Sequence, residues 1–92
     1  MVRDTIESRY QRPVAQIFAA ARQVLEQNGT LTGENTISNT LEAQIDTRTV
    51  IVTVDEVEPG VSRVRTQARK KNTMGDVDLA AELDKQIALR LR

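Results

Sequence analysis

Five basic residues lie close together in one stretch of the chain, and they are the strongest candidates for binding chemistry. The stretch from residue 63 to residue 71 contains no acid, and its cations are Arg63, Arg65, Arg69, Lys70 and Lys71. Such a cluster can bind the phosphate groups of lipids or nucleic acids. The same cations can instead pair with acids on neighbouring strands, at positions 42, 46, 55 and 56, because opposite charges facing across strands stabilise a sheet. We favour the pairing interpretation, since the stretch has no aromatic residue on which a base would stack.

Two groups of carboxylates are the next candidates. Paired carboxylates can carry out acid–base catalysis or bind a hard cation. The first group lies beside a predicted turn, and the second suits the first turn of a helix, where acids stabilise the exposed N–H groups. The two groups are Asp55, Glu56 and Glu58, and Asp76 and Asp78. We therefore predict structural roles for both groups and no metal site.

The residue types that most often perform catalysis are missing. The chain has no histidine and no cysteine, so it offers no imidazole base near neutral pH and no thiolate nucleophile. It also has no glycine-rich phosphate loop and no nucleophile motif. The sequence thus predicts a protein that is not an enzyme, with no catalytic residues and no cofactor.

Composition indicates one small domain, residues 1–92, with an aliphatic core. Of the 92 residues 39% are hydrophobic, yet only Tyr10 and Phe18 are aromatic. The formal net charge is zero, with 13 basic and 13 acidic residues, and the isoelectric point near 6.2 argues against strong binding to polyanions. Nucleic acid is therefore an unfavoured partner.

The first half of the chain begins with a strand and a helix. Residues 3–10 alternate in the manner of a strand, and Pro13 suits the start of a helix because its missing N–H would have no partner there. Apolar residues then recur at helical spacing as far as Asn28. We expect Gly29 to end this helix in a left-handed conformation and residues 30–35 to form a polar loop.

Three further strands and a second helix follow. Alternation of apolar and polar residues predicts strands over residues 37–46, 49–55 and 61–70, with a turn at Pro59-Gly60. The last of these strands places its arginines on one face and its apolar residues on the other. Asp76 is expected to cap a helix whose apolar stripe ends at Leu91.

Together these elements predict an α+β two-layer sandwich in the order β-α-β-β-β-α. A mainly antiparallel sheet of about four strands carries two helices on one face, because each helix has a single apolar stripe. The first strand fits at either edge of the sheet. The other face is expected to be polar and solvated. The predicted core contains Ile17, Phe18, Val24, Val52, Val54, Leu83 and Ile87.

The pattern resembles a family of small bacterial lipoprotein domains of unknown function. The matching pieces are Tyr10 and Pro13, the helix from Phe18 to Leu25, the strand from Val50 to Val54, Val64-Arg65, Gly75-Asp76, and Leu83, Ile87 and Leu91. The chain differs in residues 66–71, where a shorter and less basic link is expected. The resemblance implies a secreted, lipid-anchored protein whose modified cysteine would precede Met1, and it supplies no catalytic residues.

These observations favour a non-catalytic domain of the cell envelope, periplasmic or membrane-anchored, with a structural role or a protein partner that the sequence does not name. The alternative is an anion-binding module that uses the basic strand to contact lipid headgroups or nucleic acid. A third hypothesis is a homo-oligomer formed through an exposed sheet edge. The N-terminus has no apolar segment typical of a signal peptide, so the protein is either cytoplasmic or lacks its natural N-terminal segment.

Overall fold

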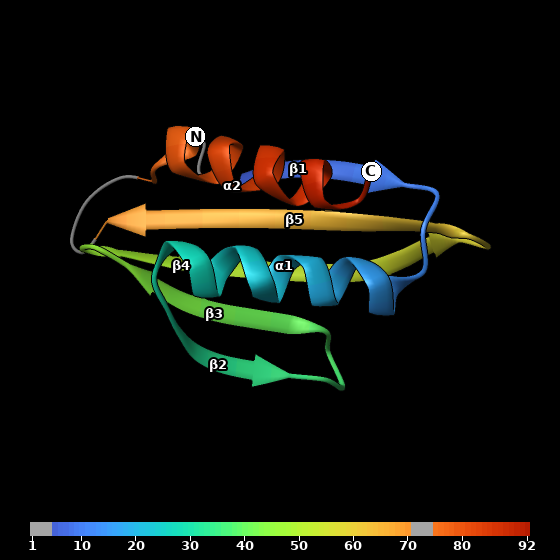
Figure 1. Cartoon of the computed structure of the whole chain (residues 1–92), viewed down its shortest axis with the longest axis horizontal. Coiled ribbons are helices and arrows are strands. Elements are labelled where there is room, and N and C mark those ends of the chain that lie inside the picture. Colours follow the sequence, from blue (N-terminus) through green and yellow to red (C-terminus); the bar gives the residue numbers. More distant parts are fainter. Residues whose placement is uncertain (1–4, 71–74) are drawn as a thin grey trace.

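The computed structural model describes residues 5–70 and 75–92 (Figure 1). In chain order, the elements are β1 (Thr5–Tyr10), α1 (Val14–Asn28), β2 (Thr30–Asn35), β3 (Thr40–Ile45), β4 (Arg48–Glu58), β5 (Val61–Lys70) and α2 (Val77–Arg90). The described residues therefore form the predicted α+β domain with two helices, but the sheet has five strands, one more than the four that the hydrophobic patterning predicted.

The strands form one antiparallel sheet in the order β1-β5-β4-β3-β2. The strands β2 to β5 follow one another as a meander, because each link between them is short. Helix α1 carries the chain across the sheet, so that β1 lies beside β5 although most of the sequence separates the two strands. The sequence was compatible with β1 at either edge of the sheet, and in the structure β1 lies at the edge beside β5.

The expectation of a polar loop at residues 30–35 is wrong. This segment is the edge strand β2, which pairs with β3 and contains a bulge between Leu31 and Gly33. Leu31 is its only large apolar residue, so the segment lacks the alternation that reveals a strand. An edge strand needs little apolar surface, because its backbone hydrogen bonds to one neighbour hold it in place.

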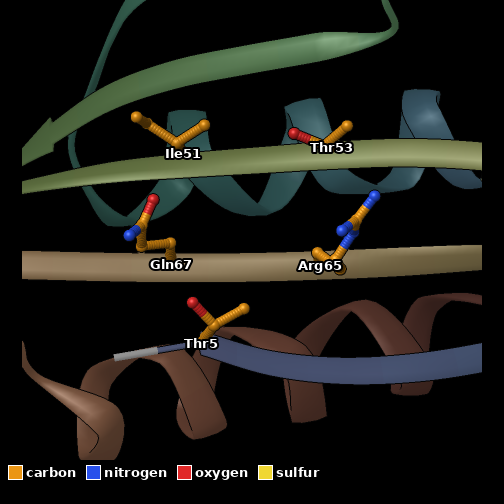
Figure 2. Close-up of a pocket in the computed structure, with 5 residues that line it drawn as sticks. All are labelled: Thr5, Ile51, Thr53, Arg65 and Gln67. Atoms are coloured by element: carbon orange, nitrogen blue, oxygen red, sulfur yellow. The ribbon is translucent and has the colours of Figure 1, made fainter. Parts of the chain in front are cut away.

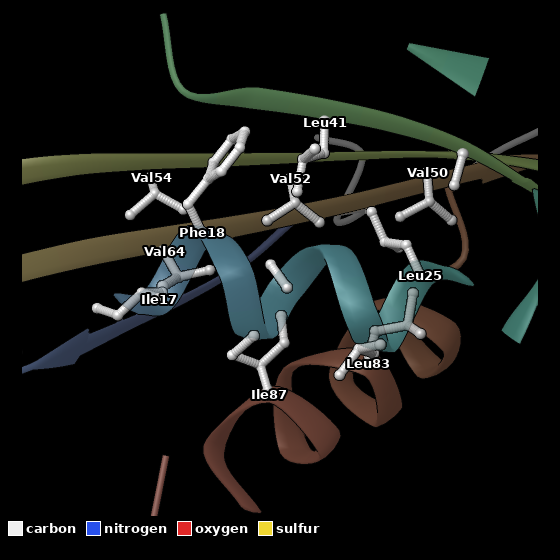
Figure 3. Close-up of a cluster of buried hydrophobic side chains, with 14 of the residues drawn as sticks. Ile17, Phe18, Leu25, Leu41, Val50, Val52, Val54, Val64, Leu83 and Ile87 are labelled. Carbon is white, nitrogen blue, oxygen red and sulfur yellow. The ribbon is translucent and has the colours of Figure 1, made fainter. Parts of the chain in front are cut away.

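The core lies between the sheet and the helices. Alternate residues of β3, β4 and β5 are buried together with the apolar stripes of α1 and α2 in one cluster (Figure 3). All seven residues that the sequence placed in the core are buried. Complete burial of an aliphatic side chain stabilises the fold by about 1.5–3 kcal/mol, so this cluster is the main stabilising feature of the domain.

Gly29 ends α1, but by a different mechanism from the one expected. Its φ of −172° is extended and not left-handed, and its N–H donates to the carbonyl oxygen of Leu25. A Cβ atom at this position would collide with the carbonyl oxygen of Gln44 and crowd the side chain of Ile45. Glycine is thus required here because α1 passes directly into β2 against the backbone of β3.

The start of α2 follows the sequence prediction. The carboxylate of Asp76 accepts a hydrogen bond from the N–H of Leu79 at 3.0 Å, which is an N-cap. Arg48 of β4 donates to the same carboxylate at 2.8 Å. The predicted turn between β4 and β5 is also confirmed, since Gly60 has a φ of +79°, a conformation that favours glycine. No helix in the described ranges is long and apolar enough to cross a membrane.

Candidate functional site

The candidate site lies on the sheet face that the core leaves exposed, here called the outer face. On β5, the buried residues Ser62, Val64, Thr66 and Ala68 alternate with outward-facing residues that are exposed or half-buried. The outward-facing residues are Arg63, Arg65, Gln67 and Arg69. Figure 2 views this face, with both helices visible behind the strands. The alternation predicted from sequence for this strand is therefore confirmed.

A shallow depression of about 340 Å³ lies on the outer face and extends from the edge strand β1 across β5 to β4. It is lined by Thr5 from β1, Ile51 and Thr53 from β4, and Arg65 and Gln67 from β5 (Figure 2). The register explains the grouping, because Gln67 faces Thr5 on one side and Ile51 on the other, and Arg65 faces Thr53. Two hydroxyls, one amide and one guanidinium thus surround a small apolar surface.

Arg65 is the charged group of this depression. Its side chain is exposed, and within the described residues it makes no hydrogen bond or ion pair. Its facing residue on β1 is Glu7, whose carboxylate instead lies 3.9 Å from the guanidinium of Arg9. Arg65 is therefore the cation of β5 whose hydrogen-bond donors are most available to a binding partner.

Arg63 differs from Arg65 because an acid on the next strand already holds it. Its Nε and Nη2 atoms donate to the two carboxylate oxygens of Asp55 at 3.1 and 2.6 Å. This bidentate hydrogen bonding lowers the pKa of Asp55 and raises that of Arg63. The predicted pairing of cations with acids across strands is confirmed for this pair, so Arg63 has little free capacity for a ligand.

The remaining members of the basic stretch do not join Arg65. Arg69 lies on the outer face but at the end of β5 opposite Thr49, and it interacts with other residues of the chain. Lys70 falls on the alternate side of the strand, where its charge contributes to the lowered pKa of Asp76. Lys71 lies outside the described residues. The four predicted cations that the structure describes therefore do not form one patch.

The acidic candidates have structural roles where contacts are present. Asp55 holds Arg63, while Asp76 caps α2 and holds Arg48. The hydrogen bond from the Leu79 N–H is the largest cause of the lowered pKa of Asp76, and Arg48 adds to it. Across residues 5–70 and 75–92, no three acidic side chains gather in a way that would hold a metal ion.

Sequence reasoning missed the composition of the depression. Alternation placed Thr5, Ile51 and Thr53 on the polar side of their strands, which was the available signal. It did not indicate that β1 pairs with β5, and this pairing brings Thr5 next to Gln67. A binding surface that spans three strands requires their order and register, and local pattern determines neither.

Comparisons with known proteins add little to this geometry. No family model matches the chain, and no curated protein matches it. Among solved structures, the chain is similar to the di-domain ARO/CYC StfQ from the steffimycin biosynthetic pathway, with a TM-score of 0.45 and 10% identity. The match covers 91% of this chain and 41% of that one, so the chain spans less than half of StfQ. At this distance the similarity supports neither an enzymatic nor a non-enzymatic function.

Proposed function

We propose that the domain is a non-catalytic binding module whose outer face docks a partner protein, with Arg65 receiving a carboxylate from that partner. The observation that carries the proposal is the exposed guanidinium of Arg65, which makes no hydrogen bond or ion pair within the described residues and borders a depression. In Figure 2 the helices lie behind the strands, on the side away from the depression, which supports docking of a partner at this face.

The chemistry of the depression suits a carboxylate side chain. A guanidinium presents parallel N–H donors that match the two oxygens of a carboxylate, and such charge-assisted bonds are stronger than neutral ones. The hydroxyl of Thr53 can donate to the same oxygens or to a neighbouring carbonyl. Ile51 offers a small apolar contact for the methylene groups of an aspartate or glutamate.

The charge of the outer face favours a protein partner over a polyanion. The acids Glu7 and Asp55 flank the arginines, so negative groups lie on both sides of Arg65. A polyphosphate backbone needs several free cations at once, whereas a single carboxylate needs one. The alternative proposal, binding of lipid headgroups or nucleic acid through the basic strand, would have to rely on Arg65 and Arg69 with Lys70 directed elsewhere.

A binding role also agrees with the ionisable groups. The whole chain lacks histidine and cysteine, and the lowered pKa values of Asp55 and Asp76 move these acids away from neutrality. A general acid or base works best with a pKa near the working pH. The resemblance to small bacterial lipoprotein domains supports placing this module in the cell envelope, held by a lipid on a preceding cysteine.

The test is an NMR titration of the ¹⁵N-labelled chain with a short capped peptide that carries a single glutamate. We expect saturable shifts of the amides of Thr53, Arg65 and Gln67, and we expect Arg65→Gln to abolish them. The matched control is Arg12→Gln, which removes an exposed arginine that the depression does not include. It should leave the titration unchanged.

Two further titrations separate the partner classes. Phosphatidylglycerol vesicles and a single-stranded oligonucleotide should each perturb the outer face less than the acidic peptide does. Equal peptide binding by the wild-type chain and Arg65→Gln would refute the proposal. Tighter binding to vesicles or to the oligonucleotide, lost in Arg69→Gln, would support the basic-strand alternative instead. The envelope location is tested separately, by measuring how much of the native protein is found in the membrane fraction of its cells and by determining its intact mass.

A further inference from the structure

We propose that two copies of this chain pair through the free edge of β1, forming one continuous sheet about a two-fold axis at Ser8. This inference is independent of the proposed function. Within the described residues, the sheet has two edges, β1 and β2. A free strand edge presents unpaired N–H and C=O groups that another strand can use.

The two edges differ in how well they are protected. The pairing of β2 with β3 is interrupted by the bulge between Leu31 and Gly33, and bulges are a common protection against edge-to-edge pairing. By contrast, β1 pairs with β5 over six consecutive residues without a register shift. It contains no proline, no lysine and no bulge, so β1 lacks three of the features that prevent another strand from adding, and its two charged residues, Glu7 and Arg9, have opposite signs.

Charge determines the register in which two β1 strands would pair. If Ser8 faces Ser8 of the second copy, Glu7 of each copy faces Arg9 of the other on the outer face. Opposite charges that face each other across strands are stabilising. On the inner side, the same register places Ile6 opposite Tyr10 of the second copy, and both residues already pack against the core.

Neighbouring registers are worse. Residues that face each other must lie on the same side of the sheet, so each alternative register places the two-fold axis at another residue of β1. With the axis at Glu7, the two copies of Glu7 would face each other, and with the axis at Arg9, the two copies of Arg9 would do so. An axis at Ile6 would place Thr5 opposite Glu7 and leave Arg9 without an acid. The Ser8 axis therefore uses both charged residues of the strand.

The isolated chain leaves these charges poorly satisfied. Arg9 faces Arg63 of β5, a like-charged residue that is already bonded to Asp55. Its contact with Glu7 on the same strand is 3.9 Å long, and the two side chains are 58% and 45% exposed. A second copy would give Arg9 an acid on its free side, so pairing supplies what β5 does not.

Helix α2 packs against β1 on the inner side of the sheet, and its residues near the edge have short side chains at two positions. Its Gln86 and Arg90 bond to residues of α1, whereas its Asp84 accepts a hydrogen bond from Ser8 of β1 at 2.8 Å. Residues 81 and 88 share the side of Asp84, because they lie three and four positions from it, and both are alanines. Ala81 and Ala88 therefore add little bulk beside Asp84.

The test is sedimentation velocity of the purified chain over a range of concentrations. We expect the mass to rise from 10.3 kDa toward twice that value. Glu7→Arg and Arg9→Glu should each raise the dimer Kd by about tenfold or more, equivalent to about 1.4 kcal/mol, because each opposes like charges twice. Glu26→Arg, an equal charge change on exposed α1 surface, should leave the Kd unchanged.

Mixing provides the sharper readout. Glu7→Arg and Arg9→Glu chains should associate with each other while neither associates with itself, and the double variant Glu7→Arg/Arg9→Glu should regain self-association. Circular dichroism melting checks that each variant remains folded, as expected for exposed positions. A strictly monomeric wild-type chain at its solubility limit would overturn the proposal. Dimerisation unaffected by Arg9→Glu would also overturn it.

Discussion

Asp76 stabilises the fold in two ways, as the N-cap of α2 and as the partner of Arg48, and two substitutions of Asp76 can separate these contributions. Asp76→Ala removes both the N-cap of α2 and the acceptor for Arg48. Loss of an aspartate cap costs about 1 kcal/mol. Loss of a charge-assisted hydrogen bond costs about 1.5 kcal/mol or more. The side chains of Arg48 and Asp76 are only 24% and 12% exposed, so solvent weakens this contact little.

Arg48 also reaches Asp46 at 3.1 Å, so it keeps one acid when Asp76 is replaced. We therefore expect the lower part of the range, a loss of about 2 kcal/mol in the free energy of unfolding for Asp76→Ala. Asp76→Asn retains an acceptor for the Leu79 N–H and should lose only about 1 kcal/mol.

The assay is urea-induced unfolding followed by circular dichroism at neutral pH. Arg48→Gln provides the third corner of a double-mutant cycle with Asp76→Asn, and the coupling between the two should account for most of the Asn effect. A loss below about 0.5 kcal/mol for Asp76→Ala would refute the reasoning, as would equal losses for the alanine and asparagine variants.

Three further predictions concern the sheet and the core. Gly29→Ala should destabilise the domain by about 2 kcal/mol or more, within the usual range for overpacking. The loss should exceed that of Gly60→Ala, because a Cβ at position 29 meets the backbone of Gln44 whereas a Cβ at position 60 meets no atom. Urea-induced unfolding of both variants checks which of them is less stable. Asp55 has a lowered pKa in the fold, so its contribution to the free energy of unfolding is complete above its unfolded pKa, near 3.9, and is lost as the pH falls through its folded pKa. Between pH 6 and pH 2, the free energy of unfolding of Asp55→Asn should therefore decline less steeply than that of the wild-type chain. Leu83→Ala should cost about 2–5 kcal/mol, since Leu83 is fully buried, and a loss below about 1 kcal/mol would contradict its place in the core.

Much of the fold could be predicted from local sequence patterns. The cap at Asp76, the turn at Gly60, the alternation of β5 and the burial of Leu83 all depend on residues within a few positions of one another. The strand β2 was not accessible, because its polar residues give no alternation and its place depends on backbone pairing with β3. Gly29 was assigned the wrong role for the same reason, since the constraint comes from the distant residue Gln44.

The sequence by itself determined the seven core residues, the approximate place of most elements, and that the arginines of β5 share one face. It was wrong at Ile37, which was predicted within a strand over residues 37–46 but lies in the turn before β3 and is 94% exposed. Only the tertiary structure decided which of those arginines is available. Asp55 lies opposite Arg63 and not Arg65 because of the register of β4 with β5. Likewise, β1 lies at the edge beside β5 because α1 crosses the sheet. Pairing between distant segments is set by how the whole chain packs, and local periodicity does not encode it.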